Sequence, residues 1–393
     1  MKNSVRYVLL GIVILVVVAS IIYLESQRPQ IPQSNPSAND FLGSLPVNST
    51  SNLSNNAPGS GTDNTPQGNY VKAPEFSGIA GWINSPSLTM QSLRGKVVLI
   101  DFWAYSCVNC IRTFPHITSW NAKYNDSGLV IIGVHTPEFN FEKDYNNVLF
   151  ATRKYDITYP VALDNDYLTW TAFQNMYWPR EYLIDRNGNI RYDHIGEGNY
   201  DETEMQIQKL LAEMGNNMTA TGLVNLTDDT PKTDNTPELY VGYNFAHSRG
   251  QDIGNPEGTI IYKTINYTMP NKPINKPDGI KPDTVYVDGL WTSNPDNLAT
   301  ASDSASSIYL SFIAKNANIV AASNISTIAE VLLDGKDISS DVAGSDVEYI
   351  GGKAYMNVSE PRLYDVYDGP YGRHLLQLVA MQQGFTFNSF TFG

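Results

Sequence analysis

An uncharged run of 18 residues, Tyr7 to Leu24, lies near the start of the chain, after Lys2 and Arg6. As a helix that rises about 1.5 Å per residue, it spans about 27 Å, close to the thickness of a bilayer core. The positive charge on its N-terminal side predicts that this end is cytoplasmic. A cleaved signal peptide is the alternative, but the run is long and Val18-Ala19-Ser20 is a poor cleavage site. We therefore expect residues 1–28 to be a single-pass membrane anchor, with the bulk of the chain extracytoplasmic.

Polar residues dominate the next stretch, 29–72, which is rich in Pro, Ser, Asn, Gly and Thr and has almost no apolar clusters. Such a sequence cannot bury enough surface to offset the entropy of ordering it. The composition predicts a flexible linker between the anchor and the first domain.

Residues 73–217 alternate between buried-strand and helical patterns. Lys96–Trp103 and Leu129–Val134 are short apolar runs rich in β-branched residues, typical of buried parallel strands. Three helices and one hairpin are expected around them, at Ile111–Tyr124, Glu142–Tyr155, Tyr182–Tyr192 (hairpin) and Glu202–Met214. This order predicts a compact α/β domain.

A second polar linker is expected at 218–235, and residues 236–393 then carry short strand-like runs between turn residues. The runs are Thr259–Tyr262, Ser307–Phe312, Glu330–Leu333 and Phe385–Phe392, with a hairpin turn at Asp334-Gly335. We expect an all-β sandwich or jelly roll here.

The composition limits which partners and which kinds of site the chain can have. The net charge of −14 argues against a nucleic-acid partner, because phosphate binding needs clustered Lys and Arg. The chain has two cysteines, Cys107 and Cys110, three positions apart. A stapled secreted fold would carry more cysteines at longer spacings, so the pair indicates a working dithiol or half of a metal site.

The Cys107-Val108-Asn109-Cys110 motif falls where a strand passes into a helix. A helix N-terminus presents free N–H groups and partial positive charge, which stabilise a thiolate. Cys107 is therefore predicted to be an exposed, easily ionised nucleophile that attacks a substrate disulfide. Cys110, one turn inward, would resolve the mixed disulfide, so no cofactor beyond a redox-active Cys107–Cys110 disulfide is expected.

These residues resemble the thioredoxin family. Asp101-Phe102-Trp103-Ala104 precedes the motif, and Pro115 lies five residues after Cys110, as in that family. The resemblance implies that Asp101 is the buried proton acceptor for Cys110, and that Trp178-Pro179 is the cis-proline segment facing the dithiol. It also implies a substrate groove lined by Tyr105, Tyr177, Trp178, Pro179 and Arg180.

A narrower resemblance is to the extracytoplasmic redoxin and β-domain portion of the DipZ family. The segments that carry it are Trp103–Pro115, Val134–Phe139, Tyr177–Pro179, Gly196–Tyr200, Thr236–Tyr240 and Phe390–Gly393. The resemblance implies exchange of disulfides with protein substrates and a carbohydrate-binding-like β domain, hence a possible glycan partner. DipZ proteins have a multi-helix membrane domain, whereas one span is expected here, so a separate membrane protein would donate or accept the electrons. Ser106 also replaces the Trp usual in thioredoxins.

Two alternatives remain open, a copper site and a binding role, whereas the sequence argues against a third, a peroxidase. His116 or His135 could complete a soft copper site with the two thiolates, as in thioredoxin-like copper chaperones. A peroxidase would need a Pro-x-x-x-Thr-x-x-Cys segment, which the sequence lacks. Alternatively, the chain could be a surface protein whose β domain, with its many Tyr and Trp291, binds a glycan or another partner.

Glu138 and Glu142, which follow the second strand, are most simply ordinary polar residues.

Overall fold

The computed structural model describes residues 70–218, 221–270, 280–323 and 325–393, and all of these residues belong to one compact unit. The predicted anchor and most of the predicted first linker lie outside the described residues. Among the helices that are described, none is long and apolar enough to cross a membrane.

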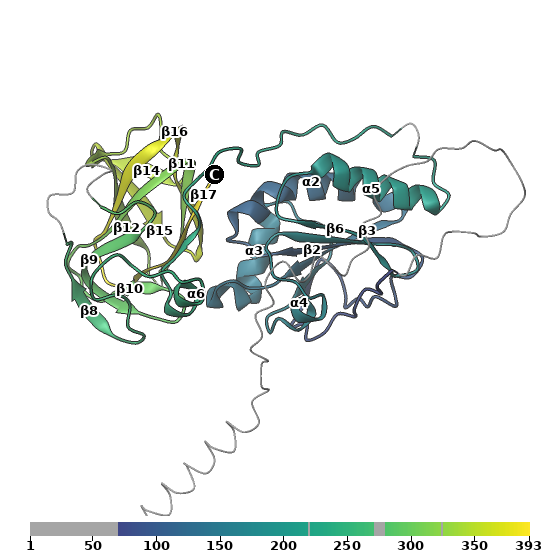
Figure 1. Ribbon diagram of the computed structural model, residues 1–393, viewed down its shortest axis with the longest axis horizontal. Coiled ribbons are helices and arrows are strands. Elements are labelled where there is room, and N and C mark those ends of the chain that lie inside the picture. The colour runs from purple at the N-terminus through teal and green to yellow at the C-terminus, as the bar shows by residue number, and fades with distance from the viewer. Residues whose placement is uncertain (1–69, 219–220, 271–279, 324) are drawn as a thin grey trace, which may run out of the picture. The chain divides into compact units, whose positions relative to one another are not determined.

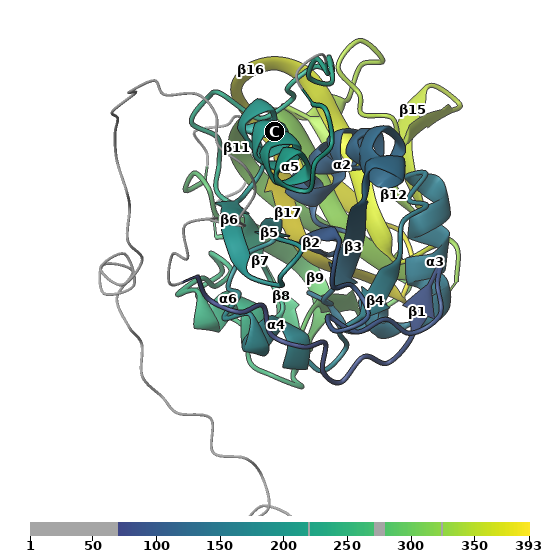
Figure 2. The same cartoon turned by 90° about the vertical axis from the view of Figure 1, so that its right-hand side faces the viewer.

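Six strands in the described part of the chain form a mixed sheet in the order β1-β4-β3-β2-β5-β6 (Figure 2). β2 pairs in parallel with β3, and β3 with β4, while β5 runs antiparallel to β2. The strands are β1 Trp82–Ile83, β2 Val97–Trp103, β3 Leu129–His135, β4 Val161–Leu163, β5 Arg180–Ile184 and β6 Ile190–Ile195. The predicted strands and hairpin are confirmed, whereas the short β1 and β4 carry too few residues to give a pattern.

β2 is buried along its whole length because helices cover both faces of the sheet (Figure 1). Leu99 and Trp103 pack against α2 and α5, while Ile100 and Phe102 pack against the region of α4 on the other face. The helices are α2 Val108–Tyr124, α3 Tyr145–Lys154, α4 Leu168–Ala172 and α5 Tyr200–Glu213, with 3₁₀ turns η1 Asn125–Ser127 and η2 Asn140–Lys143. We call the α2/α5 side the dithiol face of the sheet.

The helix predicted over Glu142–Tyr155 is divided in the structure into η2 and α3. Asp144 separates them: its backbone is extended, and its side chain accepts a hydrogen bond from the Asn146 N–H as the N-cap of α3. α2 also begins earlier than predicted, at Val108, because Cys107 itself caps the helix.

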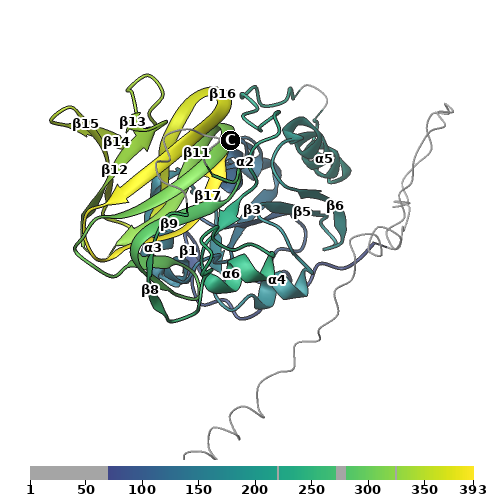
Figure 3. The same cartoon turned by 60° about the vertical axis from the view of Figure 1, so that its left-hand side comes forward.

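The C-terminal region is β-rich, with eleven antiparallel strands connected in one network across its described residues. Its longest strands, β11 and β16, run side by side (Figure 3). The elements are β7 Leu239–Tyr240, α6 Tyr243–Ser248, β8 Thr264–Tyr267, β9 Val285–Ser293, β10 Leu298–Thr300, β11 Ser306–Ser323, β12 Thr327–Leu333, β13 Lys336–Asp337, β14 Val347–Ile350, β15 Lys353–Val358, β16 Arg362–Ala380 and β17 Phe385–Phe392.

Most of the predicted strands in this region are present, and the Asp334-Gly335 turn joins β12 to β13. The strand predicted at Thr259–Tyr262 is wrong, because this segment is a loop. Tyr262 adopts a left-handed backbone (φ 60°) and 70% of its surface is exposed, so the segment offers neither extended geometry nor a buried face.

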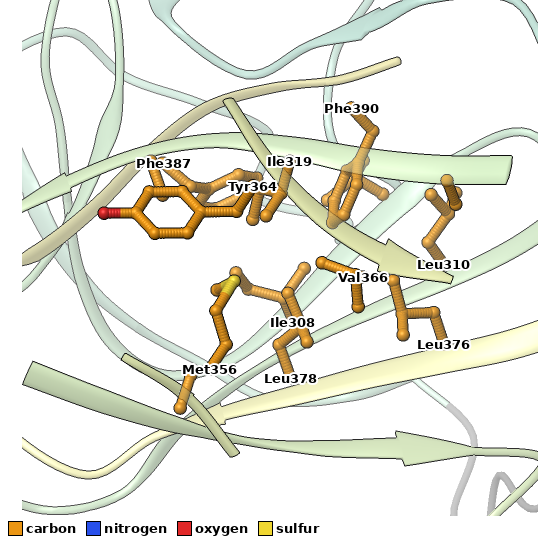
Figure 4. Close-up of a cluster of buried hydrophobic side chains, with 14 of the residues drawn as sticks. Ile308, Leu310, Ile319, Met356, Tyr364, Val366, Leu376, Leu378, Phe387 and Phe390 are labelled. Carbon is orange, nitrogen blue, oxygen red and sulfur yellow. The ribbon is translucent and has the colours of Figure 1, made fainter. Parts of the chain in front are cut away.

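An apolar core fills the C-terminal region. Side chains from β11, β16 and β17 meet within it, including Ile308, Leu378 and Phe390 (Figure 4). Trp291 is fully buried there against Phe385 and Phe387. This tryptophan is therefore a core residue and not a sugar-stacking surface.

Candidate active site: a capped dithiol under a mixed wall

The two cysteines lie where β2 leads into α2. Cys107 is the N-cap of α2, and its Sγ accepts a hydrogen bond from the Cys110 N–H at 3.3 Å. The two cysteines are not joined by a disulfide. Cys110 is fully buried, whereas Cys107 retains 8% of its surface. The strand and the helix thus place one sulfur at the edge of the domain and the other behind it.

The structure corrects the prediction that Cys107 is exposed and easily ionised. Burial raises the pKa of the Cys107 thiol, and the negative charge of Glu138 raises it further. A hydrogen bond from the Cys110 side chain acts in the opposite direction, but burial is the larger effect. The helix N-terminus alone therefore does not decide the acidity of this cysteine.

Cys107 opens into a pocket of about 250 Å³, formed partly by the C-terminal region. The redoxin-side residues include Val108, Asn109, Glu138, Met176, Tyr177 and Trp178. The opposite wall is Thr236, Glu238, Tyr240, Arg249, Thr391 and Phe392. A substrate that reaches Cys107 through this pocket would therefore contact both parts of the chain.

Asp101 lies on β2 behind the dithiol. Its side chain is completely buried, and neither carboxylate oxygen has a hydrogen-bond partner among the described residues. Burial raises its pKa to about 7. A carboxyl group with this pKa can exchange a proton near neutral pH, which is the property that the proton-acceptor role requires.

Glu142, which sequence reasoning treated as ordinary, holds the cysteine loop in place. Its buried carboxylate accepts hydrogen bonds from the backbone N–H and the hydroxyl of Ser106, at 3.1 and 2.7 Å. The second oxygen accepts from the N–H groups of Glu138 and Phe139. Glu142 thus connects Ser106, the residue before Cys107, to the loop after β3.

Glu138 joins the site to the C-terminal region. It is buried, and the Tyr240 hydroxyl donates a hydrogen bond to its carboxylate. Burial raises the pKa of Glu138 well above its usual range. The partner lies 102 residues away in the sequence, so no local pattern could have revealed this contact.

The two histidines considered as copper ligands lie in different surroundings. His116 stacks on Tyr200 with ring centroids 3.6 Å apart. His135 is fully buried, and burial lowers its pKa to about 3, so the ring is neutral. In the ranges that the structure describes, no group of three His, Cys, Asp or Glu residues could hold a metal ion.

The predicted substrate residues separate into two groups. The Trp178–Pro179 peptide is cis, and Trp178 lines the Cys107 pocket while its Nε1 donates to the Thr136 carbonyl at 3.0 Å. Tyr177 also lines this pocket. Tyr177 and Trp178 therefore share a pocket with Cys107, and Pro179 follows Trp178 in the cis peptide.

Tyr105 and Arg180 do not lie with them, which corrects the prediction. Tyr105 is 4% exposed, and its hydroxyl donates to the Pro361 carbonyl at 3.0 Å, so the C-terminal region covers it. Arg180 is on the face of β5 opposite the dithiol, where it pairs with Asp193 at 2.7 Å and lies over Tyr182. Adjacent strand residues point to opposite faces, so Arg180 cannot share a face with Glu181, its neighbour on the dithiol face.

A CxxC dithiol at the N-terminus of a helix, beside a cis-proline in a mixed sheet, defines the class of thiol–disulfide oxidoreductases with a thioredoxin fold. Residues 71–193 match the AhpC/TSA family, and residues 236–393 match the thioredoxin-like C-terminal domain family. The chain belongs to the thioredoxin-like redoxin family.

Individual proteins are similar to parts of this chain. The thiol–disulfide oxidoreductase YkuV of Bacillus subtilis is 31% identical over 36% of this chain and 94% of its own length. Protein DipZ of Mycobacterium tuberculosis is 39% identical over 69% of this chain, but the match spans only 38% of that protein. Among solved structures, a thioredoxin-like protein in its oxidised form is 31% identical, with a TM-score of 0.35, over 37% of this chain and 97% of that one.

Proposed function

We propose that this chain is a membrane-anchored, extracytoplasmic thiol–disulfide oxidoreductase that exchanges disulfides with protein substrates through Cys107 and Cys110. The arrangement that carries the proposal is Cys107 at a pocket with Cys110 behind it and Asp101 beneath. The Cys107 thiolate attacks a substrate disulfide, forming one S–S bond and releasing one substrate thiolate. Cys110 then gives its proton to Asp101 and attacks the Cys107 sulfur, so the second substrate thiolate leaves and the Cys107–Cys110 disulfide forms.

The raised pKa of Cys107 slows the first step of this cycle at neutral pH. In the free enzyme little thiolate is present at neutral pH, because burial favours the neutral thiol. Attack on a substrate therefore becomes faster as the pH rises toward the pKa of Cys107. Trp178 and Pro179 would bind the substrate backbone next to the reacting sulfur.

Membrane attachment rests on the run Tyr7–Leu24 and its flanking charges. A single span cannot import electrons by itself, so a separate membrane donor or acceptor is part of the proposal. Fractionation of cells and protease digestion of intact cells test it. A full-length chain found in the soluble fraction, or protected from external protease, would contradict the proposed topology.

Replacing Cys107 by Ser tests the chemical proposal. Turnover of a disulfide-bonded model protein should disappear in Cys107→Ser, while Cys110→Ser should accumulate a mixed disulfide that mass spectrometry detects. Turnover that survives the first change would refute the dithiol mechanism. Measuring the reduction potential of the Cys107–Cys110 couple then indicates whether the enzyme reduces or oxidises its substrates.

A glycan ligand for the C-terminal region remains a prediction from the resemblance to DipZ. The proposed β-sandwich or jelly roll exposes the rings of Tyr262 and Tyr349, by 70% and 45%. Binding of cell-surface polysaccharide by Cys107→Ser would support a binding role that is independent of the dithiol.

A further inference from the structure

Glu181 is a second buried acid on the dithiol face, directly beside Asp101. In the antiparallel β2–β5 pair, Asp101 and Glu181 are register partners. Residues that face each other in such a pair lie on the same face, with Cβ atoms about 4.5–5.5 Å apart. Leu183, two positions further along β5, packs in the core under α2 and α5, which places Glu181 on that face as well.

The carboxyl groups of Asp101 and Glu181 have few hydrogen-bond partners. Glu181 is 2% exposed, and its Oε2 has no hydrogen-bond partner in the part of the chain that the structure describes. The Glu181 side chain does form a hydrogen bond with Thr203 of α5. Asp101, with neither oxygen satisfied, is 0% exposed. A carboxyl group buried in this way is expensive unless it is protonated or serves a purpose.

The ionisable groups around the pair come from every neighbouring element. Cys110 of α2 and Tyr159, which precedes β4, interact electrostatically with Asp101, and Tyr159 also interacts with Glu181. On β6, Tyr192 interacts with Glu181, and His194 is its register partner. The His194 ring contacts the Glu197 carbonyl instead of the pair, at 3.4 Å.

The two acids influence each other's ionisation. Burial raises the pKa of Asp101 to about 7. Burial, and then the negative charge of Asp101, raise the pKa of Glu181 to about 8. Two carboxylates this close in a low-dielectric interior do not both ionise readily, so the protons leave in two steps that belong to the pair.

We propose that Asp101 and Glu181 work as one proton-holding pair, in which the second carboxyl group, that of Glu181, extends the range of pH over which Cys110 can be deprotonated. The inference rests on the proposed function and deepens it. When Cys110 attacks the mixed disulfide, its S–H proton passes to the pair, its sulfur forms the bond to Cys107, and the substrate sulfur leaves with the electron pair. The proton afterwards returns to solvent.

The test measures the rate at which substrate is released from a preformed mixed disulfide on Cys107, in single turnover between about pH 5 and 9. Wild type should show two transitions. Asp101→Asn should retain one transition, now due to Glu181, at a lower pH because the neighbouring charge is gone. Adding Glu181→Gln to Asp101→Asn should remove this transition and slow release at least a further tenfold at about pH 8.

Glu204→Gln is the matched control. Glu204 is also a buried glutamate of this region, 1% exposed, but it pairs with Lys123 at 2.7 Å and does not adjoin the dithiol. Its pH profile should be that of wild type. The proposal is overturned if Asp101→Asn and the double variant have superimposable profiles.

A measurement on the unsubstituted chain covers the case in which the double variant does not fold. Carbon-13 NMR of the side-chain carboxyl groups should show Asp101 and Glu181 titrating together between about pH 6 and 9. A Glu181 carboxyl already ionised at pH 5 would refute the pair. Failure of the proposed function is a separate outcome, since Cys110→Ser would then form no mixed disulfide at all.

Discussion

The interior beneath the dithiol and the interior of the C-terminal region differ in the polar groups that they bury. Under the dithiol, the ionisable side chains of Asp101, His135 and Glu181 are buried with polar atoms that have no partner among the described residues. The C-terminal core is formed by aliphatic and aromatic side chains (Figure 4), and the buried atoms without a partner in that region are mostly hydroxyl groups, such as that of Ser311. Unpaired ionisable groups lower stability. The comparison indicates that the first interior gives up stability to handle protons, whereas the second serves packing.

The largest expected effect is on turnover, and it distinguishes the dithiol site from the C-terminal core. Cys107→Ser should lower turnover by at least about a thousandfold, because serine at this position cannot form the S–S intermediate. Phe387→Leu, a mild change in the C-terminal core, should leave turnover within about threefold. Steady-state reduction of a model disulfide measures both. Comparable losses in the two variants would mean that the C-terminal core matters to the chemistry as much as the nucleophile does.

Truncation in the C-terminal core should reduce stability strongly. Phe387 is fully buried against Trp291 and Phe390, so Phe387→Ala should lower the free energy of unfolding by about 3–5 kcal/mol. Urea denaturation followed by tryptophan fluorescence measures the change. A loss below about 1 kcal/mol would show that this core tolerates a cavity and is not tightly packed.

Removing the buried acid Asp101 should raise the free energy of unfolding at high pH, whereas truncating Phe387 lowers it. The folded pKa of Asp101, about 7, lies above the ordinary value of 3.8 for an aspartic acid, so between these values the folded state binds more protons than the unfolded state. Stability therefore falls as pH rises through this window, by up to about 4 kcal/mol. Asp101→Asn should remove the part of this slope that Asp101 causes, while Glu181 keeps its own part.

The measurement is denaturation of wild type and Asp101→Asn at about pH 4 and pH 8. The variant should be more stable than wild type at the higher pH and similar to it at the lower one. A variant that is less stable at pH 8 would show that the Asp101 carboxylate has favourable contacts, contrary to its burial without partners.

The smallest effect concerns the contact between the two regions. Tyr240→Phe removes the hydroxyl that donates to Glu138 and should lower stability by about 1–2 kcal/mol. Tyr371→Phe, a change at a half-exposed tyrosine of the same region, is the control and should have little effect. Equal melting temperatures for Tyr240→Phe and wild type would mean that this contact does not hold the pocket wall in place.

Sequence alone determined the features that depend on neighbouring residues. The apolar run of β2, the CxxC and the amphipathic α2 are consecutive, so their pattern placed the dithiol at a strand-to-helix junction. Asp101 was identified by its place in the Asp101-Phe102-Trp103-Ala104 segment, which resembles the thioredoxin active site. Glu181 was not predicted, because the predicted hairpin begins at Tyr182 and the inward position of Glu181 follows from the register of β5.

Tertiary structure decided whatever depends on residues that meet across the chain. Cys107 is dehydrated because Glu238, Tyr240 and Phe392 help to enclose its pocket, although they follow it by more than a hundred positions. The same region covers Tyr105 through Pro361, and the register of β5 turns Arg180 away from the dithiol. Acidity and access depend on which groups surround an atom, and local sequence patterns do not contain that information.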